Sequence, residues 1–142
     1  MRLEECFEKR LLRKIKPDMK KAKKSLETSK KKLEEAKKAL KLRLFNSCMI
    51  MAYTAMFHAA RSLLYKDGIQ EKSHVCAIIY LKQKYMKELS ATLINALNVH
   101  RIERHEALYG IEFVVTEDDC RIAIEDAEDL IKRVERLLGS NL

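Results

Sequence analysis

The chain of 142 residues contains only three glycines, one proline and no tryptophan. This scarcity leaves few positions for the tight turns that β-rich domains need, whereas Ala, Leu, Lys and Glu, which favour helices, are abundant. We therefore predict an all-α protein. A chain of this length is sufficient for one core, and no linker or repeat divides residues 1–142, so we expect a single domain.

The chain also lacks cysteines at metal-binding spacing. Cys6, Cys48, Cys76 and Cys120 are far apart, and no pair has the gap of two to four residues that is usual in zinc sites. The last three lie within apolar helical patterns, where cysteine behaves as a small hydrophobic residue. We expect no metal site, no disulfide framework and no bound cofactor.

Long apolar segments are missing as well. Residues 1–16, MRLEECFEKRLLRKIK, are charged throughout and do not resemble a secretion signal. The longest strongly apolar run, residues 48–57, is much shorter than the roughly 20 residues that span a bilayer. We therefore expect a protein without membrane contact in the cytoplasm, whose reducing conditions suit unpaired cysteines.

Positive charge is concentrated in one segment. Residues 9–43 hold 16 Lys or Arg against 4 Asp or Glu, so their local charge is +12 although the whole chain carries +8. Lysines can follow a phosphate backbone by releasing counterions, but here they occur at many helical angles without aromatic residues among them. We favour a solvated face for the helix of residues 18–42 and keep nucleic-acid binding as the alternative.

Helical patterns cover nearly the whole chain. Residues 45–65 are apolar on almost all sides, which is typical of a helix buried all round. Gly68 suits the end of this helix, and the hydroxyls of Ser73 and Thr116 suit the starts of two others. The apolar spacing predicts a helical extension over residues 1–16 and an up-and-down bundle of about five helices over residues 17–138, comprising 18–42, 45–65, 73–85, 87–109 and 116–138.

The most informative single residue is Arg104. It falls on the apolar side of the predicted helix 87–109, where an unpaired charge is costly. His100 shares that face because it lies four residues earlier. A planar guanidinium suits a phosphate, and a structural ion pair or the rim of a subunit interface explains it equally well. His58 and His74 stand alone and are interpreted as hydrogen-bonded or capping residues.

Three segments together resemble the HEPN domains, a family named for nucleotide binding. Residues 52–68, AYTAMFHAARSLLYKDG, look like the central helix of small stand-alone prokaryotic members. Residues 72–74, Lys-Ser-His, follow where those members place a similar sequence, and residues 44–47 are similar to their helix junction. The resemblance covers roughly residues 25–138 and implies a HEPN helical bundle that forms a homodimer around the Arg104 helix.

The resemblance also implies where a site lies. HEPN ribonucleases carry an Arg, a polar residue, three further residues and a His on a late helix, and two such helices form a metal-independent cleft for RNA cleavage. This chain supplies Arg104 and His105 but ends the motif with Tyr109, and a phenol is a poor proton shuttle at neutral pH. Arg104 and His105 are the candidates for catalysis, and His100 and Tyr109 join them as candidates for nucleotide or RNA binding.

The leading functional hypothesis is a non-catalytic or weakly active HEPN module that binds nucleotide or RNA. By resemblance, such modules act as partners of a minimal nucleotidyltransferase or within a toxin–antitoxin pair. An active metal-independent ribonuclease toxin is the alternative, with Arg104 stabilising the phosphorane and a histidine from elsewhere moving protons. A structural helical adaptor without a ligand is the second alternative.

Overall fold

The computed structural model describes residues 1–139. Helices dominate these residues, which confirms the predicted all-α bundle, and the only sheet among them has two short strands. In chain order the elements are α1 (Leu3–Glu8), β1 (Leu12–Lys14), α2 (Met19–Lys41), α3 (Phe45–Asp67), β2 (Ile69–Glu71), α4 (His74–Lys84), α5 (Met86–Leu89), α6 (Ala91–Tyr109) and α7 (Glu117–Leu138).

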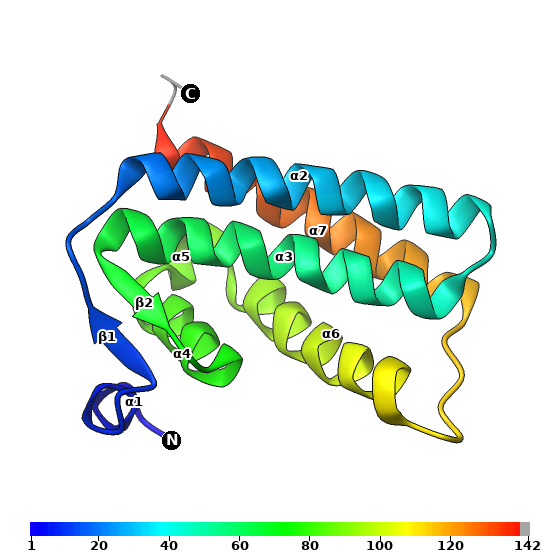
Figure 1. Ribbon diagram of the computed structural model, residues 1–142, viewed down its shortest axis with the longest axis horizontal. Coiled ribbons are helices and arrows are strands. Elements are labelled where there is room, and N and C mark those ends of the chain that lie inside the picture. The colour runs from blue at the N-terminus through cyan, green and yellow to red at the C-terminus, as the bar shows by residue number, and fades with distance from the viewer. Residues whose placement is uncertain (140–142) are drawn as a thin grey trace.

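Helix α3 runs through the middle of the bundle, as its apolar sequence predicts. Figure 1 shows α2 above it, α7 behind it, and α4 and α6 below it. Twelve of its residues are buried, so every neighbouring helix packs its apolar stripe against α3. No helix among residues 1–139 is both long and apolar enough to cross a membrane.

Helices α2 and α3 approach closely because small residues line their contact. Ala22 and Ala36 of α2 are fully buried, and serine hydroxyls fill the remaining space while donating to carbonyl groups of the opposite helix. Such bonds satisfy buried hydroxyls without a polar partner side chain. The three bonds join Ser25 Oγ to His58 O at 2.7 Å, Ser29 Oγ to Ala55 O at 2.6 Å and Ser62 Oγ to Ala22 O at 2.7 Å.

The N-terminal segment differs from the prediction of a helical extension over residues 1–16. Helix α1 ends at Glu8, and Leu12 to Lys14 form a strand that pairs with β2 in antiparallel register. Gly68 makes this pairing possible: its φ of +77° suits glycine, and a Cβ there would lie 2.6 Å from the Ile15 carbonyl oxygen. The apolar spacing of residues 1–15 could not indicate this pairing, because the two strands are more than 50 residues apart in the sequence.

Two further predictions are corrected. Residues 87–109 do not form one helix, because Ser90 has a φ of +71° and separates α5 from α6. Its hydroxyl accepts a hydrogen bond from the Leu93 N–H at 3.1 Å and so starts the new helix. The cysteines were expected to stay unpaired, but Cys6 of α1 and Cys76 of α4 form a disulfide. Cys48 and Cys120 are free and buried.

Candidate functional site

Helix α6 carries all four residues predicted for the site, but it directs them to different surroundings. His100 is only 3% exposed. Its Nδ1 lies 2.6 Å from Glu103 Oε1, and its Nε2 lies 2.7 Å from Asp126 Oδ2 of α7. Both ring nitrogens are therefore occupied by carboxylates, and His100 joins α6 to α7.

His105 and Tyr109 point outward. Tyr109 is 70% exposed, and its ring lies 4.9 Å from the exposed ring of His105. A helix turns by about 100° per residue, so neither side chain shares the direction of Arg104. Within one chain the structure does not bring these two residues together with Arg104.

Arg104 points inward, toward α3 and α4. Its Nε atom is buried and has no hydrogen-bond partner within residues 1–139. Burial raises the pKa of Tyr53 on α3 and lowers the pKa of His74 on α4. The positive charge of Arg104 acts to lower the pKa of both groups. A buried guanidinium N–H without an acceptor is costly, and it marks a place where an added acceptor is favourable.

His74 is the central residue that the sequence interpretation missed. Its Nδ1 lies 2.7 Å from the Tyr53 hydroxyl, and its ring is stacked on Phe57 with centroids 3.7 Å apart. Burial, followed by the charges of Arg104, Arg61 and Arg101, lowers the pKa of His74 to about 4. The ring is therefore neutral at pH 7. When the Tyr53 hydroxyl donates to Nδ1, the ring proton sits on Nε2, which is then a donor; in the other tautomer Nδ1 donates to Tyr53 and Nε2 accepts.

Two more arginines surround this ring. Arg61 of α3 lies over the Phe57 ring at 5.0 Å, and its Nε donates to Glu71 Oε1 at 2.6 Å. Arg101 of α6 donates from its Nε to Asn98 Oδ1 at 3.1 Å. Three guanidinium groups thus act on a neutral His74, and within residues 1–139 only that of Arg61 is paired with a carboxylate.

We call Tyr53, Phe57, Arg61, His74, Arg101 and Arg104 the arginine cluster. Its surplus of positive charge, its N–H donors and its stacked rings suit a phosphate or another planar or tetrahedral anion. A sequence signal for part of it existed, because residues 53, 57 and 61 recur every four positions and therefore share one face of α3. No local sequence pattern indicates that α4 and α6 pack against this face of α3.

The lowered pKa of His74 predicts a pH-dependent stability. Unfolded histidine titrates near its ordinary value of 6.5, whereas His74 in the folded protein titrates near 4. Between pH 6.5 and pH 4 the unfolded state binds a proton at His74 that the folded state does not bind. The contribution of the neutral His74 to the free energy of unfolding is therefore complete above pH 6.5 and is lost as the pH falls toward 4. We expect a loss of about 1–2 kcal/mol between pH 7 and pH 4.5, after allowance for solvent screening.

Urea unfolding of His74→Gln at the two pH values measures this contribution. The variant cannot take up the proton, so its stability should fall less than that of the wild type by the same amount. His105→Gln is the matched control, because it removes an exposed histidine and should follow the wild-type curve. If the free energy of unfolding of His74→Gln falls between the two pH values as much as that of the wild type, His74 is not held neutral by its surroundings.

Residues 18–137 match the HEPN domain. The chain belongs to the HEPN family. A UPF0332 protein from Archaeoglobus fulgidus is 30% identical over 103 residues, which cover 71% of this chain and 82% of that protein. The match spans α2 to α7, so the helices that carry the arginine cluster all lie within the HEPN domain, while α1 and β1 precede it.

Proposed function

We propose that this HEPN domain binds the phosphate group of a nucleotide or RNA in the arginine cluster and does not cleave it. The buried Arg104 Nε, which has no hydrogen-bond partner in the described part of the chain, carries the proposal, because a phosphate oxygen would supply an acceptor. Arg101 and His74 Nε2 offer further donors beside it. An arginine present only for an ion pair would have a carboxylate partner, as Arg61 has in Glu71.

The proton chemistry of the cluster supports binding without cleavage. Cleavage of RNA needs a group that accepts a proton near neutral pH. His74, which burial and the arginine charges hold at a pKa of about 4, is a weak base, and its hydrogen bond to Tyr53 occupies Nδ1. Tyr109 supplies no imidazole at the last motif position.

The second candidate function is a metal-independent ribonuclease, and one observation favours it. His74 lies beside Arg104, so a histidine from another helix takes a place near the motif arginine. Incubation of the protein with RNA in the presence of a chelator tests this candidate. Cleavage by the wild type that is lost in both Arg104→Ala and His74→Gln would replace the binding proposal with the enzymatic one.

We further propose that two copies form a homodimer through α6 and the segment that follows it. Large apolar side chains are exposed there, and one copy has nothing to cover them. In such a dimer the exposed His105 and Tyr109 of each copy are available to line a shared cleft. The exposed apolar side chains of α6 and the following segment include Val99, Ile102, Leu108, Ile111 and Val114.

A dimer of this HEPN domain fits a role as partner of a nucleotidyltransferase or as one half of a toxin–antitoxin pair in the cytoplasm. Disulfides are rare in that compartment, but intracellular proteins of hyperthermophiles are an exception. The high Lys and Glu content of the chain agrees with adaptation to heat. Co-expression with the product of a neighbouring nucleotidyltransferase gene, followed by purification through one member, tests the partnership; separate elution would exclude it.

Replacement of Arg104 by alanine is expected to weaken binding of adenosine monophosphate roughly 10- to 100-fold, since a charged hydrogen bond contributes about 1.5–3 kcal/mol. Isothermal titration calorimetry measures this change. Arg136→Ala is the matched control, because Arg136 is an exposed arginine on α7 and its loss changes the net charge equally. Equal affinity of the wild type and Arg104→Ala would remove the arginine cluster as the binding site.

A further inference from the structure

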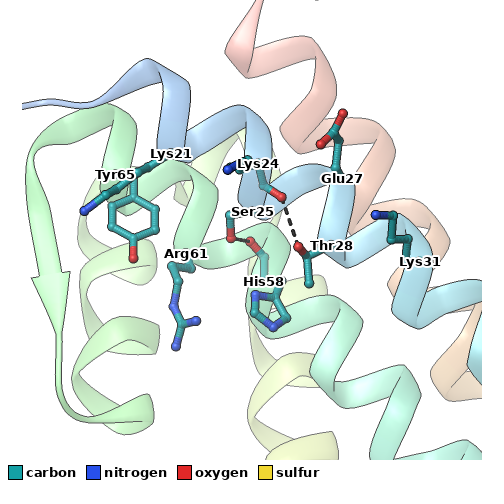
Figure 2. A pocket seen from close by; sticks show the side chains of 9 residues that line it. All are labelled: Lys21, Lys24, Ser25, Glu27, Thr28, Lys31, His58, Arg61 and Tyr65. Carbon is teal, nitrogen blue, oxygen red and sulfur yellow. Dashed lines mark hydrogen bonds between the residues drawn. The ribbon is translucent and has the colours of Figure 1, made fainter.

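A basic groove lies between α2 and α3, and it shares Arg61 of α3 with the arginine cluster. It has a volume of about 370 Å³. Figure 2 shows lysines of α2 along one side and three residues of α3 along the other. We call this the α2–α3 groove, and its lining consists of Lys21, Lys24, Ser25, Glu27, Thr28, Lys31, His58, Arg61 and Tyr65.

The lysines of this groove have no carboxylate partner within residues 1–139, whereas Arg61 is paired with Glu71. Lys21, Lys24 and Lys31 form no ion pair within residues 1–139, and Glu27 is the only acidic residue in the lining. Other lysines of the same helix do have carboxylate partners, and these are Lys30 with Glu135, Lys32 with Glu35, and Lys37 with Glu34 and Glu128. The unpaired lysines of α2 therefore include those that face the groove.

The two hydroxyl groups that α2 contributes to the groove already have partners. Ser25 donates to the His58 carbonyl, and Thr28 donates to the Lys24 carbonyl at 3.1 Å. The His58 ring is neutral at pH 7, because burial and then the charges of Arg61 and Lys32 lower its pKa. Recognition in this groove therefore depends mainly on cationic side chains, which favours a charged backbone over a ligand with many hydroxyl groups.

Arg61 connects the groove with the arginine cluster. Its side chain lines the groove, while its guanidinium lies over Phe57 and bonds to Glu71 beside His74. The same charge acts on the His58 ring in the groove and on the His74 ring in the cluster. Arg61, although it is paired with Glu71, is therefore the residue that the groove and the arginine cluster have in common.

We propose that the α2–α3 groove binds the phosphodiester backbone of single-stranded RNA, with a neighbouring phosphate of the same strand held in the arginine cluster. This inference rests on the proposed function and assigns it a polymeric ligand in place of a mononucleotide. Each lysine contact releases a counterion from the strand. The unpaired lysines, the shared arginine and the surplus charge of the groove support it.

Charge reversal at neighbouring lysines tests the groove. Lys24→Glu changes a lysine in the lining, whereas Lys23→Glu changes the next residue, which lines a different depression beside Glu135. Both positions are exposed, and both variants alter the net charge equally. Fluorescence anisotropy with an RNA of about 12 nucleotides, a length in the range of known single-strand sites, gives the affinities at several salt concentrations.

Lys24→Glu is expected to weaken RNA binding about five- to tenfold and to reduce the slope of log K against log salt by roughly 0.7, the value for one lost phosphate contact. Lys23→Glu should weaken RNA binding clearly less than Lys24→Glu, because Lys23 does not line the groove and its loss removes only nonspecific attraction. Binding of adenosine monophosphate should be unchanged in both variants, because neither lysine belongs to the arginine cluster.

If both variants weaken RNA binding equally, the proposal that the groove binds RNA is wrong, because general attraction to a basic helix would then explain binding. The proposal is also wrong if polyglutamate of similar length binds as tightly as the RNA. Binding of adenosine monophosphate without RNA binding would remove the groove but leave the proposed function intact. RNA binding that depends on Lys24 but not on Arg104 would keep the groove and remove the arginine cluster. Failure to bind either probe would end both proposals.

Discussion

Reduction of the disulfide between Cys6 and Cys76 is expected to lower the free energy of unfolding by about 4 kcal/mol. The bond closes a loop with a sequence separation of 70 residues, and a cross-link of that span removes conformational entropy from the unfolded chain by about this amount. It also ties α1 to α4, which begins with His74 of the arginine cluster. Urea unfolding with and without a reductant measures the effect.

Helix α1 depends on this bond more than the longer helices do. It has only six residues, and isolated helices of that length are unstable in water. Cys6 is nevertheless fully buried, and the Met1 Sδ lies 3.6 Å from the sulfur atoms of both Cys6 and Cys76. After reduction, we expect amide hydrogen exchange to accelerate first in α1 and β1.

Thiol titration of the denatured protein provides the control. Without a reductant, two thiols should react, which are those of the free Cys48 and Cys120, and after reduction all four cysteines should react. The variant Cys6→Ser/Cys76→Ser should unfold at the same urea concentration with and without reductant. Four reactive thiols before reduction would show that the bond is absent and would remove the expected stabilisation.

The helices could be predicted from the sequence because their signals are local. The apolar residues of α3 indicated a helix buried all round, and the predicted caps Ser73 and Thr116 accept hydrogen bonds from Cys76 N–H and Asp119 N–H. The break at Ser90 could not be predicted in this way, because a positive φ at a serine is unusual. The pairing of β1 with β2 depends on residues more than 50 positions apart.

The residues of the candidate site could likewise be predicted only where the signal lies in nearby residues. Arg104 was identified because its charge interrupts an apolar stripe on its own helix. His74 was interpreted as a capping residue, since nothing near it in the chain reveals the stacked Phe57 ring or the hydroxyl of Tyr53. The same limit applies to His100, whose partner Asp126 belongs to α7. Packing of α3, α4 and α6 creates the arginine cluster, and no single segment contains it.

Replacement of Asp67 by alanine is expected to destabilise the protein by roughly 3 kcal/mol. Asp67 Oδ2 accepts hydrogen bonds from the hydroxyls of Tyr80 at 2.9 Å and Tyr85 at 2.6 Å, and Oδ1 accepts from Lys66 Nζ at 2.9 Å. Both tyrosines are buried, so loss of the carboxylate leaves two hydroxyl groups without an acceptor. Thermal and urea unfolding measure the change.

A cycle of variants separates these hydrogen bonds from other effects of the aspartate. In Tyr80→Phe/Tyr85→Phe protein, Asp67→Ala should cost much less than in the wild type, because no buried hydroxyl then loses its partner. Asp67 is the last residue of α3, where the helix dipole disfavours a negative charge. Once the tyrosine bonds are gone, its removal should therefore have little effect, because the relief from the helix dipole offsets the loss of the Lys66 ion pair. An equal cost of Asp67→Ala in both backgrounds would show that the two bonds do not stabilise the junction of α3 with α4.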